Sequence, residues 1–425
     1  MDKEELLILG AGLSSLGFYN ALSKGVLYEK SDRPGGHAKS FKVGNSYFDQ
    51  GAHICHSKNP DWLEQINTEN ISNIKGNVVN YQKGNIISYP VQNNLIDLKQ
   101  VDRIKALEGV FNASKITATP TNYLEWLLSQ YGEYLTNEFY IPFTLKYWRT
   151  EPQDLSIDWL KGRLLPVDLN RILKGSFSKD NESQAAFNYF KYPKDGGFES
   201  FFSGLYKDLP IKNNKKAIEI SLKDKTVKFS DGTTTGYSKL VSSISLKELC
   251  DISIDLPFKL KELSKKLFYL NLIQINIITK KISEKFKGVH WFYVYDKDID
   301  ISRVSLLHNI KGIEDSNPVI QAEIFRRNDE NYNMDSIVEK GVNHLMEIFD
   351  ISRDQIDIVE PKKIEYSYVV SDENKTEIVN QLIKYFEGEG VKSIGLYGKW
   401  DYVWSDKAYE NGYNDGKKYY EENYN

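Results

Sequence analysis

The sequence is poor in cysteine and in long apolar runs. Its 425 residues include two cysteines, Cys55 and Cys250, too few for a disulfide framework or a cysteine-based zinc site. This usage suits a reducing cytoplasm, where we expect the protein to reside. No apolar run approaches the ~18 residues that a membrane-spanning helix needs. The first residues, MDKEELLILGAG, also lack the positive charge of a signal peptide.

Arginine is scarce as well, with 9 arginines against 46 lysines. An AT-rich genome explains this bias, since asparagine, isoleucine and tyrosine are plentiful too. The shortage matters because planar, two-pronged contacts to anions favour arginine. The formal net charge of −4 argues against broad nucleic-acid binding, which needs clustered positive charge.

The chain contains enough hydrophobic residues to form a large core. Hydrophobic residues make up 40% and charged residues 27%, a composition that excludes a disordered chain. The length predicts two or three domains, or one large body with an inserted lobe.

The first thirty residues predict a strand, glycine turn, helix and second strand of the dinucleotide-binding type. The apolar run from Glu5 to Gly10 resembles a buried strand, and the helix that follows stops at Gly25. Gly10 permits the tight turn, and Gly12 lets the backbone approach a pyrophosphate at the helix N-terminus. Ser15 stands where the third glycine is usual, which weakens the pattern.

Glu29 ends the second predicted strand, nineteen residues after Gly10. A carboxylate at this place accepts hydrogen bonds from both ribose hydroxyls and repels a 2′-phosphate. The nucleotide is therefore expected to be FAD or NAD rather than NADP.

The residues after Glu29 carry a family resemblance. A paired glycine, Gly35–Gly36, follows the acid, as in the FAD-dependent amine-oxidase superfamily. Within it, the segment GAHICHS, residues 51–57, is most similar to that of the UDP-galactopyranose mutases. The resemblance implies that Gly51, Ala52 and His53 lie against the flavin ring. The alternatives are that His53 and His56 are structural histidines or a metal-binding pair, but no cluster of further ligands accompanies them, so we expect no metal.

The middle of the chain predicts a hairpin over 77–98 and then helices over 101–111, 120–136 and 155–173. The segment 140–156 resembles a mutase segment that includes Trp148, which either stacks on a ring of the ligand or fills the core. The mutases continue with two arginines in a short run. Here Arg163 fits the first, Asp168 lies near the second, and Arg171 comes late.

The second half predicts a return to the nucleotide domain and then a β-rich region. An amphipathic helix is expected over 199–209, followed by a β-meander whose first strand places Ala217 near adenine by resemblance. Arg303 matches a mutase arginine aimed at the substrate diphosphate. Tyr366 and Tyr368 stand where that family has a substrate tyrosine, although an aromatic residue on a sheet face is an equal alternative.

The C-terminal part resembles the second FAD motif of the superfamily. Gly395 fits its glycine, but Leu396 replaces its arginine, so the pyrophosphate contact is lost or supplied by Lys399 or by backbone. Asp406 begins a helix and can reach the flavin or its ribityl chain. The polar tail after residue 416 is expected to be frayed.

These observations predict an α/β protein with a Rossmann-like FAD-binding domain, an inserted helical lobe and an antiparallel β-sheet substrate domain. We expect the FAD-binding domain at 1–75, 195–255 and 385–425, the β-rich domain at 76–98 and 256–384, and the lobe at 99–194. The expected catalytic residues are His53, Arg303, Arg163, Trp148 and Tyr368. The expected cofactor-binding residues are Gly10, Gly12, Ser14, Ser15, Glu29, Lys30, Gly35, Gly36, His37, Ala38, Gly51, Ala52, His53, Ala217, Gly395 and Asp406.

Three functions are open on this basis. The first is an FAD-dependent oxidoreductase acting on a small-molecule substrate from a polysaccharide pathway, with a nucleotide sugar such as a UDP-sugar as the leading expectation. The second is a mutase-type ring contraction with reduced FAD, without net redox change. The third is an amine oxidase or a non-catalytic FAD-binding protein.

Overall fold

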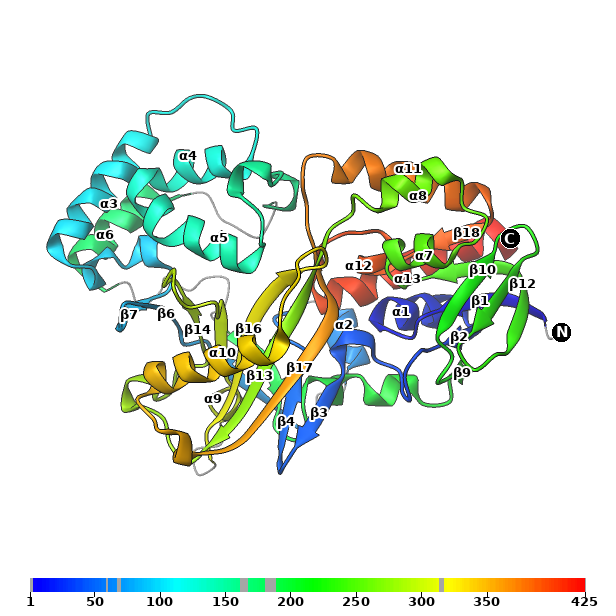
Figure 1. Cartoon of the computed structure of the whole chain (residues 1–425), viewed down its shortest axis with the longest axis horizontal. Helices are drawn as coiled ribbons and strands as arrows, with labels where there is room; N and C mark the ends of the chain where they lie inside the picture. Colours follow the sequence, from blue (N-terminus) through cyan, green and yellow to red (C-terminus); the bar gives the residue numbers. More distant parts are fainter. Residues whose placement is uncertain are drawn as a thin grey trace.

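The computed structural model describes residues 3–58, 60–66, 70–160, 167–179, 189–312 and 317–424. Its described part contains two seven-stranded sheets and a helical lobe, and Figure 1 shows the second sheet standing between the lobe and the first sheet.

The first sheet contains the N-terminal strand at its centre. The order is β10-β11-β12-β1-β2-β9, and β18 also pairs with β12. β1 runs parallel to β2 and to β12, and Leu7, Ile8 and Leu9 are fully buried, as expected for a strand covered on both faces. The strands are β1 (Lys3–Leu9), β2 (Val26–Tyr28), β9 (Ile211–Lys212), β10 (Ala217–Ser221), β11 (Thr226–Phe229), β12 (Thr234–Ser242) and β18 (Val391–Ser393).

The first and last helices of the chain pack tightly together over this sheet. α1 (Leu13–Leu22) lies against α13 (Ser405–Tyr424) (Figure 1). A Cβ atom on Gly412 would lie 2.0 Å from the Ser14 carbonyl oxygen, and one on Gly17 would lie 2.2 Å from the Tyr409 carbonyl oxygen. Both ends of the chain therefore build one domain.

The expectation of a frayed tail is wrong. α13 continues to Tyr424, and Tyr419 is buried with its ring 5.4 Å from that of Phe18. Tyrosines on one face of the polar tail supply the apolar contact that holds it.

The second sheet is mostly antiparallel and has two unlike faces. Its order is β17-β13-β16-β15-β14-β6-β7. One face is apolar, with Ile273 and Ile275 of β13 packed under α10 (Met334–Phe349). The opposite face carries buried polar side chains, among them Gln274 and Glu323. The strands are β6 (Val78–Gln82), β7 (Asn85–Ser88), β13 (Tyr269–Thr279), β14 (Trp291–Val294), β15 (Arg303–Leu306), β16 (Val319–Arg327) and β17 (Ile356–Val369).

The helical lobe contains α3 (Gln100–Ala113), α4 (Tyr123–Leu135), α5 (Ile141–Tyr147) and α6 (Leu169–Phe177). The expected hairpin over 77–98 and the first two expected helices are confirmed. The helix expected over 155–173 is wrong at its start, where Leu155 forms a β-bridge with Asp372, but its last five residues, 169–173, lie in α6. α6 begins at Leu169, where the Asp168 side chain accepts hydrogen bonds from two backbone N–H groups and caps the helix.

The expected helix over 199–209 is also wrong. The segment forms two short 3₁₀ turns, Phe198–Phe201 and Ser203–Tyr206. Burial of Phe198, Phe201 and Phe202 together overrides the amphipathic pattern. The remaining elements are β3 (Ser40–Val43), β4 (Ser46–Asp49), α2 (Pro60–Gln65), β5 (Ile71–Lys75), β8 (Tyr189–Pro193), α7 (Leu246–Ile252), α8 (Phe258–Ser264), α9 (Leu307–Lys311), α11 (Lys375–Gly388) and α12 (Gly395–Gly398).

The two sheets draw on the chain segments expected for the two domains. All strands of the first lie within 1–75, 195–255 and 385–425, and all strands of the second within 76–98 and 256–384. β8, inside the range of the expected lobe, pairs with β5 instead. The exact domain boundaries stay a prediction. In the described ranges, none of the helices is both long and apolar enough to cross a membrane.

Candidate active site

The glycine turn that follows β1, at Gly10 and Gly12, lies very close to the turn formed by Gly35 and Gly36. Gly10 has φ of 87° and its N–H donates to the Tyr28 carbonyl. A Cβ on Gly36 would lie 3.1 Å from Gly12 Cα, so only glycine allows this approach. Ser15, at the usual third glycine, is fully buried and its hydroxyl lies 2.8 Å from that of Ser243. The serine therefore serves the close packing expected of that position.

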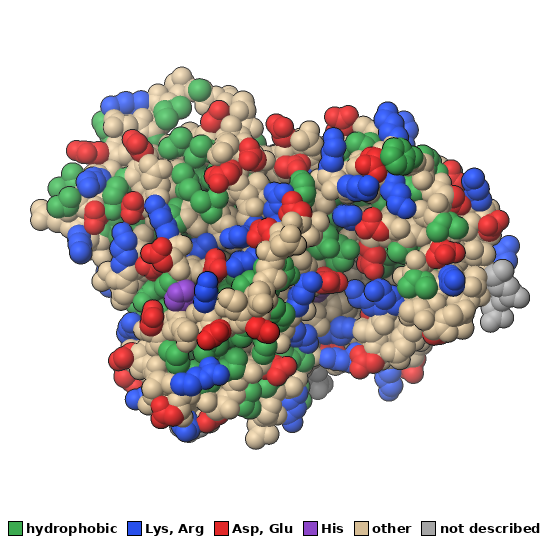
Figure 2. All heavy atoms as spheres, viewed as in Figure 1, with side chains coloured by type: hydrophobic (Ala, Val, Ile, Leu, Met, Phe, Trp, Pro, Cys, Tyr) green, Lys and Arg blue, Asp and Glu red, His purple; other side chains and the backbone are tan. Residues whose placement is uncertain are grey.

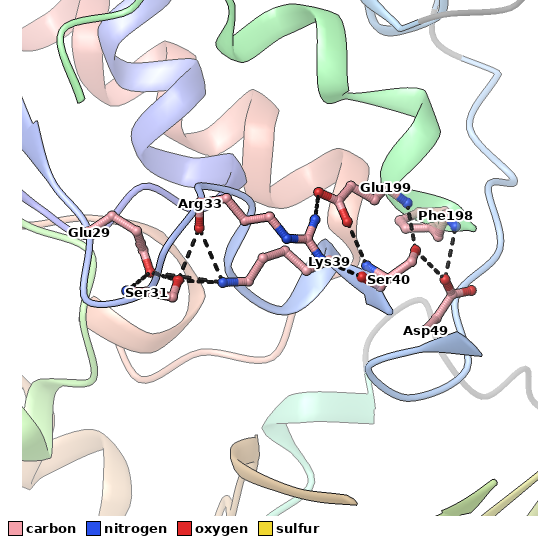
Figure 3. A network of polar contacts seen from close by, with 8 residues as sticks. All are labelled: Glu29, Ser31, Arg33, Lys39, Ser40, Asp49, Phe198 and Glu199. Carbon is pink, nitrogen blue, oxygen red and sulfur yellow. Dashed lines mark hydrogen bonds and ion pairs between the residues drawn. The ribbon is translucent and has the colours of Figure 1, made fainter. Parts of the chain in front are cut away.

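Glu29 lies at the end of β2 with its carboxylate held from both sides. The two oxygens accept hydrogen bonds from Ala11 N–H and Ser31 N–H, each at 3.0 Å. The Lys39 ammonium lies 4.0 Å away, and Figure 3 shows this part of the network. The carboxylate is thus fixed at the edge of the glycine turn.

The same network continues from Lys39 to the antiparallel strand pair formed by β3 and β4. Arg33 forms an ion pair with Glu199, and Asp49 accepts hydrogen bonds from Ser40 Oγ at 2.6 Å and Phe198 N–H at 2.9 Å (Figure 3). Asp49 is 1% exposed, so its charge is held by these donors. The network fixes where the chain leaves β4 for residues 50–53.

A cavity of about 560 Å³, here called the cofactor cavity, lies over these turns. Gly10, Gly12 and Glu29 form one wall, and Ala217 another. Six lysines and three glutamates line it, so its described charged groups favour an anion. The lysines are Lys30, Lys39, Lys215, Lys216, Lys362 and Lys363, and the glutamates are Glu29, Glu248 and Glu365.

The position of the missing arginine faces this cavity as well. Gly395 has φ of 74°, and a Cβ there would lie 2.4 Å from Ser14 Oγ. Leu396 lines the cofactor cavity, whereas Lys399 pairs with Asp415 at 2.7 Å and is not among its described lining residues. The positively charged residues that do line this cavity are lysines on other segments, Lys39 and Lys362 among them.

A second cavity of about 390 Å³, here called the aromatic cavity, adjoins the first. Among its lining residues are ten tyrosines and four tryptophans, mostly from the lobe and the second sheet. The two cavities share eight lining residues and therefore adjoin each other. The shared residues are His37, Gln50, His53, Ile364, Leu396, Tyr397, Val403 and Ser405.

The loop at this shared wall is clamped by the polar face of the second sheet. The Gln274 side chain accepts from Gly51 N–H at 2.8 Å and donates to the Asp49 carbonyl at 2.9 Å. Glu323 accepts from Ala52 N–H at 2.8 Å. Gly51 itself has φ of 88°. The backbone of this loop is therefore presented to the cavities by neighbouring strands, β13 and β16.

The histidines beside this loop are neutral at pH 7. Burial lowers the pKa of His53, and burial with the nearby Lys30 charge lowers the pKa of His37 to about 4. Burial also lowers the pKa of His56. In the described part of the chain, no group of three or more His, Cys, Asp and Glu side chains is placed to hold a metal ion.

Arg303 lines the aromatic cavity but is already paired. Its Nε and Nη2 donate to the two oxygens of Glu323 at 2.8 and 2.9 Å. Glu323 is 1% exposed, and the negative charges around Arg303, Glu323 first, hold the pKa of the guanidinium above its ordinary value despite burial. Glu323 thus joins the arginine of one cavity to the loop at the wall of both.

Trp148 and Tyr368 both lie where a ligand could reach them, and their contact with a ligand stays a prediction. Both line the aromatic cavity, and Trp148 is also packed in the core with its ring 5.0 Å from that of Trp159. Tyr366 instead lines the cofactor cavity.

Most of the expected site residues lie around the two cavities. His53, Arg303, Trp148 and Tyr368 line the aromatic cavity, and Asp406 lies at its edge in the first turn of α13. Ser15 lies behind the cofactor cavity, and Gly395 packs on Ser14 in its wall. Arg163 falls outside the described residues. The expected residues that line the cofactor cavity are Gly10, Gly12, Ser14, Glu29, Lys30, Gly35, Gly36, His37, Ala38, His53 and Ala217; Gly51 and Ala52 line the aromatic cavity.

The sequence prediction missed Gln274 and Glu323. Both had a signal, since polar residues recur at every second position in two otherwise apolar strands, QIN at 274–276 and QAE at 321–323. Alternation of this kind places polar groups on one buried face, where they need partners.

The residues present fit an FAD. The cofactor cavity is lined by glycine turns in which a Cβ atom would crowd the neighbouring backbone. It also contains the fixed carboxylate of Glu29 and more lysines than glutamates. His37 Nδ1, on the shared wall, is buried without a hydrogen-bond partner among the described residues. An orphaned polar atom beside an anion-favouring cavity is expected where a cofactor completes the site.

The fold of the chain is similar to that of known proteins. Residues 8–67 match the model of an NAD(P)-binding Rossmann-like domain. Over 99% of this chain and 96% of the other, the structure is similar to that of a reduced UDP-galactopyranose mutase, with a TM-score of 0.88 and 21% identity. A putative protoporphyrinogen oxidase from Exiguobacterium sp. 255-15 matches over 99% of both chains, with a TM-score of 0.74 and 14% identity. A redesigned putrescine oxidase matches over 98% of this chain and 99% of the other, with a TM-score of 0.61 and 12% identity.

These likenesses, which extend over almost the whole chain, confirm the fold class expected from the motifs. In its fold, the chain therefore shares the architecture of a UDP-galactopyranose mutase and of the two oxidases.

Proposed function

We propose that the protein is an FAD-dependent enzyme that converts a sugar or a nucleotide sugar in the aromatic cavity. One observation carries this proposal: the aromatic and cofactor cavities share the wall formed by residues such as Gln50 and His53. A substrate in one cavity would therefore lie beside the reactive end of a cofactor held in the other.

The cofactor would be held by the glycine turns at Gly10, Gly12 and Gly36, with Glu29 accepting from its ribose. The lysines of the cofactor cavity would neutralise its pyrophosphate. When bound, FAD supplies hydride or electron transfer, or a nucleophilic nitrogen, at the ring edge.

The protein's own part is positioning and electrostatics. Gln274 and Glu323 hold the backbone of Gly51 and Ala52 in place. His53, being neutral, can donate one hydrogen bond and accept another, and its Nδ1 lies 3.2 Å from the Gly51 carbonyl. The aromatic walls exclude water from the reacting atoms.

A mutase reaction on a nucleotide sugar is the finer form of this proposal. The likeness in fold to UDP-galactopyranose mutase and the place of Arg303 in the aromatic cavity support it. Arg303 would hold the diphosphate. Its pairing with Glu323 favours a second candidate, an oxidase for an uncharged substrate, because that pair offers a diphosphate no net charge.

An assay with both redox states of the flavin separates the two candidates. Dithionite-reduced enzyme that converts UDP-galactofuranose to the pyranose would establish the mutase. Peroxide release from uncharged sugars or amines by oxidised enzyme, with no mutase turnover, would establish the oxidase. A protein that takes up FAD and does neither would contradict the proposed activity.

A further inference from the structure

The charged groups of the aromatic cavity leave little attraction for an anion. Among the described residues that line it, the charged side chains are Arg303, Glu323 and Asp406. Arg303 and Glu323 cancel through their two hydrogen bonds, so Asp406 leaves one net negative charge. The cofactor cavity, with its excess of lysines, has the opposite balance. The two adjoining cavities are therefore suited to ligands of different charge.

The uncharged part of the wall suits a ring that carries hydroxyl groups. Tyrosine and tryptophan offer flat apolar faces together with polar edges. Several of these rings are oriented by one another: Tyr131 and Tyr140 are stacked at 4.1 Å, and the Tyr147 and Tyr402 hydroxyls lie 3.5 Å apart. Such a wall packs on the C–H faces of a sugar and offers partners to its hydroxyls.

A second polar atom of this wall, besides His37 Nδ1, has no partner among the described residues. Ser305 is 1% exposed, lines the aromatic cavity, and its Oγ makes no hydrogen bond there. It lies two residues after Arg303 on β15, on the same face of the strand. A buried hydroxyl without a partner costs free energy unless a ligand or a water satisfies it.

We propose that the aromatic cavity binds an uncharged, hydroxyl-bearing sugar ring. In this proposal the carboxylate of Glu323 cancels the charge of Arg303, so that the pair presents no net charge to the substrate. This inference rests on the proposed function and specifies its substrate class. The Ser305 hydroxyl and the tyrosine edges hold the ring hydroxyls, and the negative charge of Asp406 disfavours a nucleoside diphosphate.

The test compares an uncharged probe with a charged one. Methyl β-galactoside is titrated into the FAD-loaded and the FAD-free protein, and UDP into the FAD-loaded protein alone, because the empty cofactor cavity would itself attract UDP. Quenching of tryptophan fluorescence is the readout, because four of the seven tryptophans line the cavity. We expect the glycoside to bind both forms, and to bind the FAD-loaded form at least tenfold more tightly than UDP does, with no dependence on salt. Tighter binding of UDP, or no binding of the glycoside, would overturn the inference.

Two substitutions make the test specific. Glu323→Gln removes the charge that cancels Arg303, so UDP should bind at least fivefold more tightly while the glycoside changes less. Ser305→Ala should weaken the glycoside at least threefold and leave UDP unchanged. Tyr237→Phe, in a buried tyrosine of the first sheet, is the matched control and should change neither. If UDP binding is the same in wild type and Glu323→Gln, the charge argument is wrong.

Flavin uptake is scored in the same experiment and is independent of it. A protein that binds the glycoside but takes up no FAD would refute the proposed function and leave the substrate class standing. A protein that takes up FAD and prefers UDP would do the reverse.

Discussion

Single polar side chains on the second sheet connect the two cavities. Glu323 accepts hydrogen bonds from Ala52 N–H on one side and from Arg303 on the other. Gln274 accepts a hydrogen bond from Gly51 N–H. Neither residue belongs to a recognised motif, yet both determine where the loop of residues 51–53 lies.

Gln274→Leu should destabilise the protein and weaken FAD binding together. The substitution leaves the Gly51 N–H and the Asp49 carbonyl buried without partners, which costs about 2–3 kcal/mol of the free energy of unfolding. Urea unfolding and flavin titration measure the two effects. Gln153→Leu, at an exposed position, is the control, and equal behaviour of the two variants would show that the clamp contributes nothing.

His290 should make the protein less stable in mild acid. Burial lowers its pKa to about 4, and its Nδ1 accepts from Asn77 N–H at 2.8 Å. The folded-state pKa lies below the unfolded value, so this stabilisation is full above about pH 6.5 and is lost as the pH falls toward 4.

The measurement is the loss of unfolding free energy between pH 7 and pH 5. In His290→Gln this loss should be smaller than in wild type by about 2 kcal/mol, since one pKa unit corresponds to 1.36 kcal/mol. Gln153→Leu, at an exposed position and without a titratable group, serves as the comparison and should keep the wild-type loss. An unchanged loss in His290→Gln would contradict the assignment.

At this scale, the sequence predicted the conformation of those residues whose geometry depends on a short local segment. Gly10, Glu29 and Gly36 follow from short spacings, because one turn and one strand end decide their geometry. The pairing of Arg303 could not be foreseen in the same way. It depends on the register that sets Arg303 opposite Glu323 on β16, twenty residues further along the chain.

At the scale of elements, α1 and α13 pack against each other beside the cofactor cavity. Glycines from both helices allow the backbones to approach: Gly17 on α1, and Gly412 and Gly416 on α13. The sequence predicted α1 from its glycine turn, but the polar composition of residues 405–425 concealed the tyrosine face that anchors α13. The sequence predicted a helix that begins at Asp406, and tertiary packing extends this helix through the tail that was expected to be frayed.

Gly412→Ala should separate these helices and impair FAD retention. Its Cβ would overlap the Ser14 carbonyl, and relief of such a clash typically costs about 1–3 kcal/mol. Gly388→Ala is the matched control, because nothing lies within 4 Å of a Cβ at that helical position. Thermal unfolding should show a lower midpoint for Gly412→Ala and an equal or higher one for Gly388→Ala. Equal midpoints would contradict the close-packing account.

At the scale of the whole molecule, charge is divided between two cavities rather than between two ends of the chain. On the face drawn in Figure 2, acidic and basic side chains are interspersed, whereas the interior concentrates lysines over the glycine turns and aromatic rings over the loop at residues 51–53. The sequence predicted that both ends build one site. It could not predict the charge balance of each cavity, because the lining residues come from segments far apart in the chain.

The account depends first on the cofactor, so FAD titration is its most direct test. Flavin absorbance, measured after unbound FAD is removed, should show one FAD per chain for the wild type. Glu29→Gln should lower the affinity about tenfold or more, because a hydrogen bond to a charged group contributes about 1.5–3 kcal/mol. Glu262→Gln, in an exposed ion pair on α8, should bind as the wild type does. A folded wild-type protein that retains no FAD, or a Glu29→Gln variant that binds it equally well, would contradict the central claim.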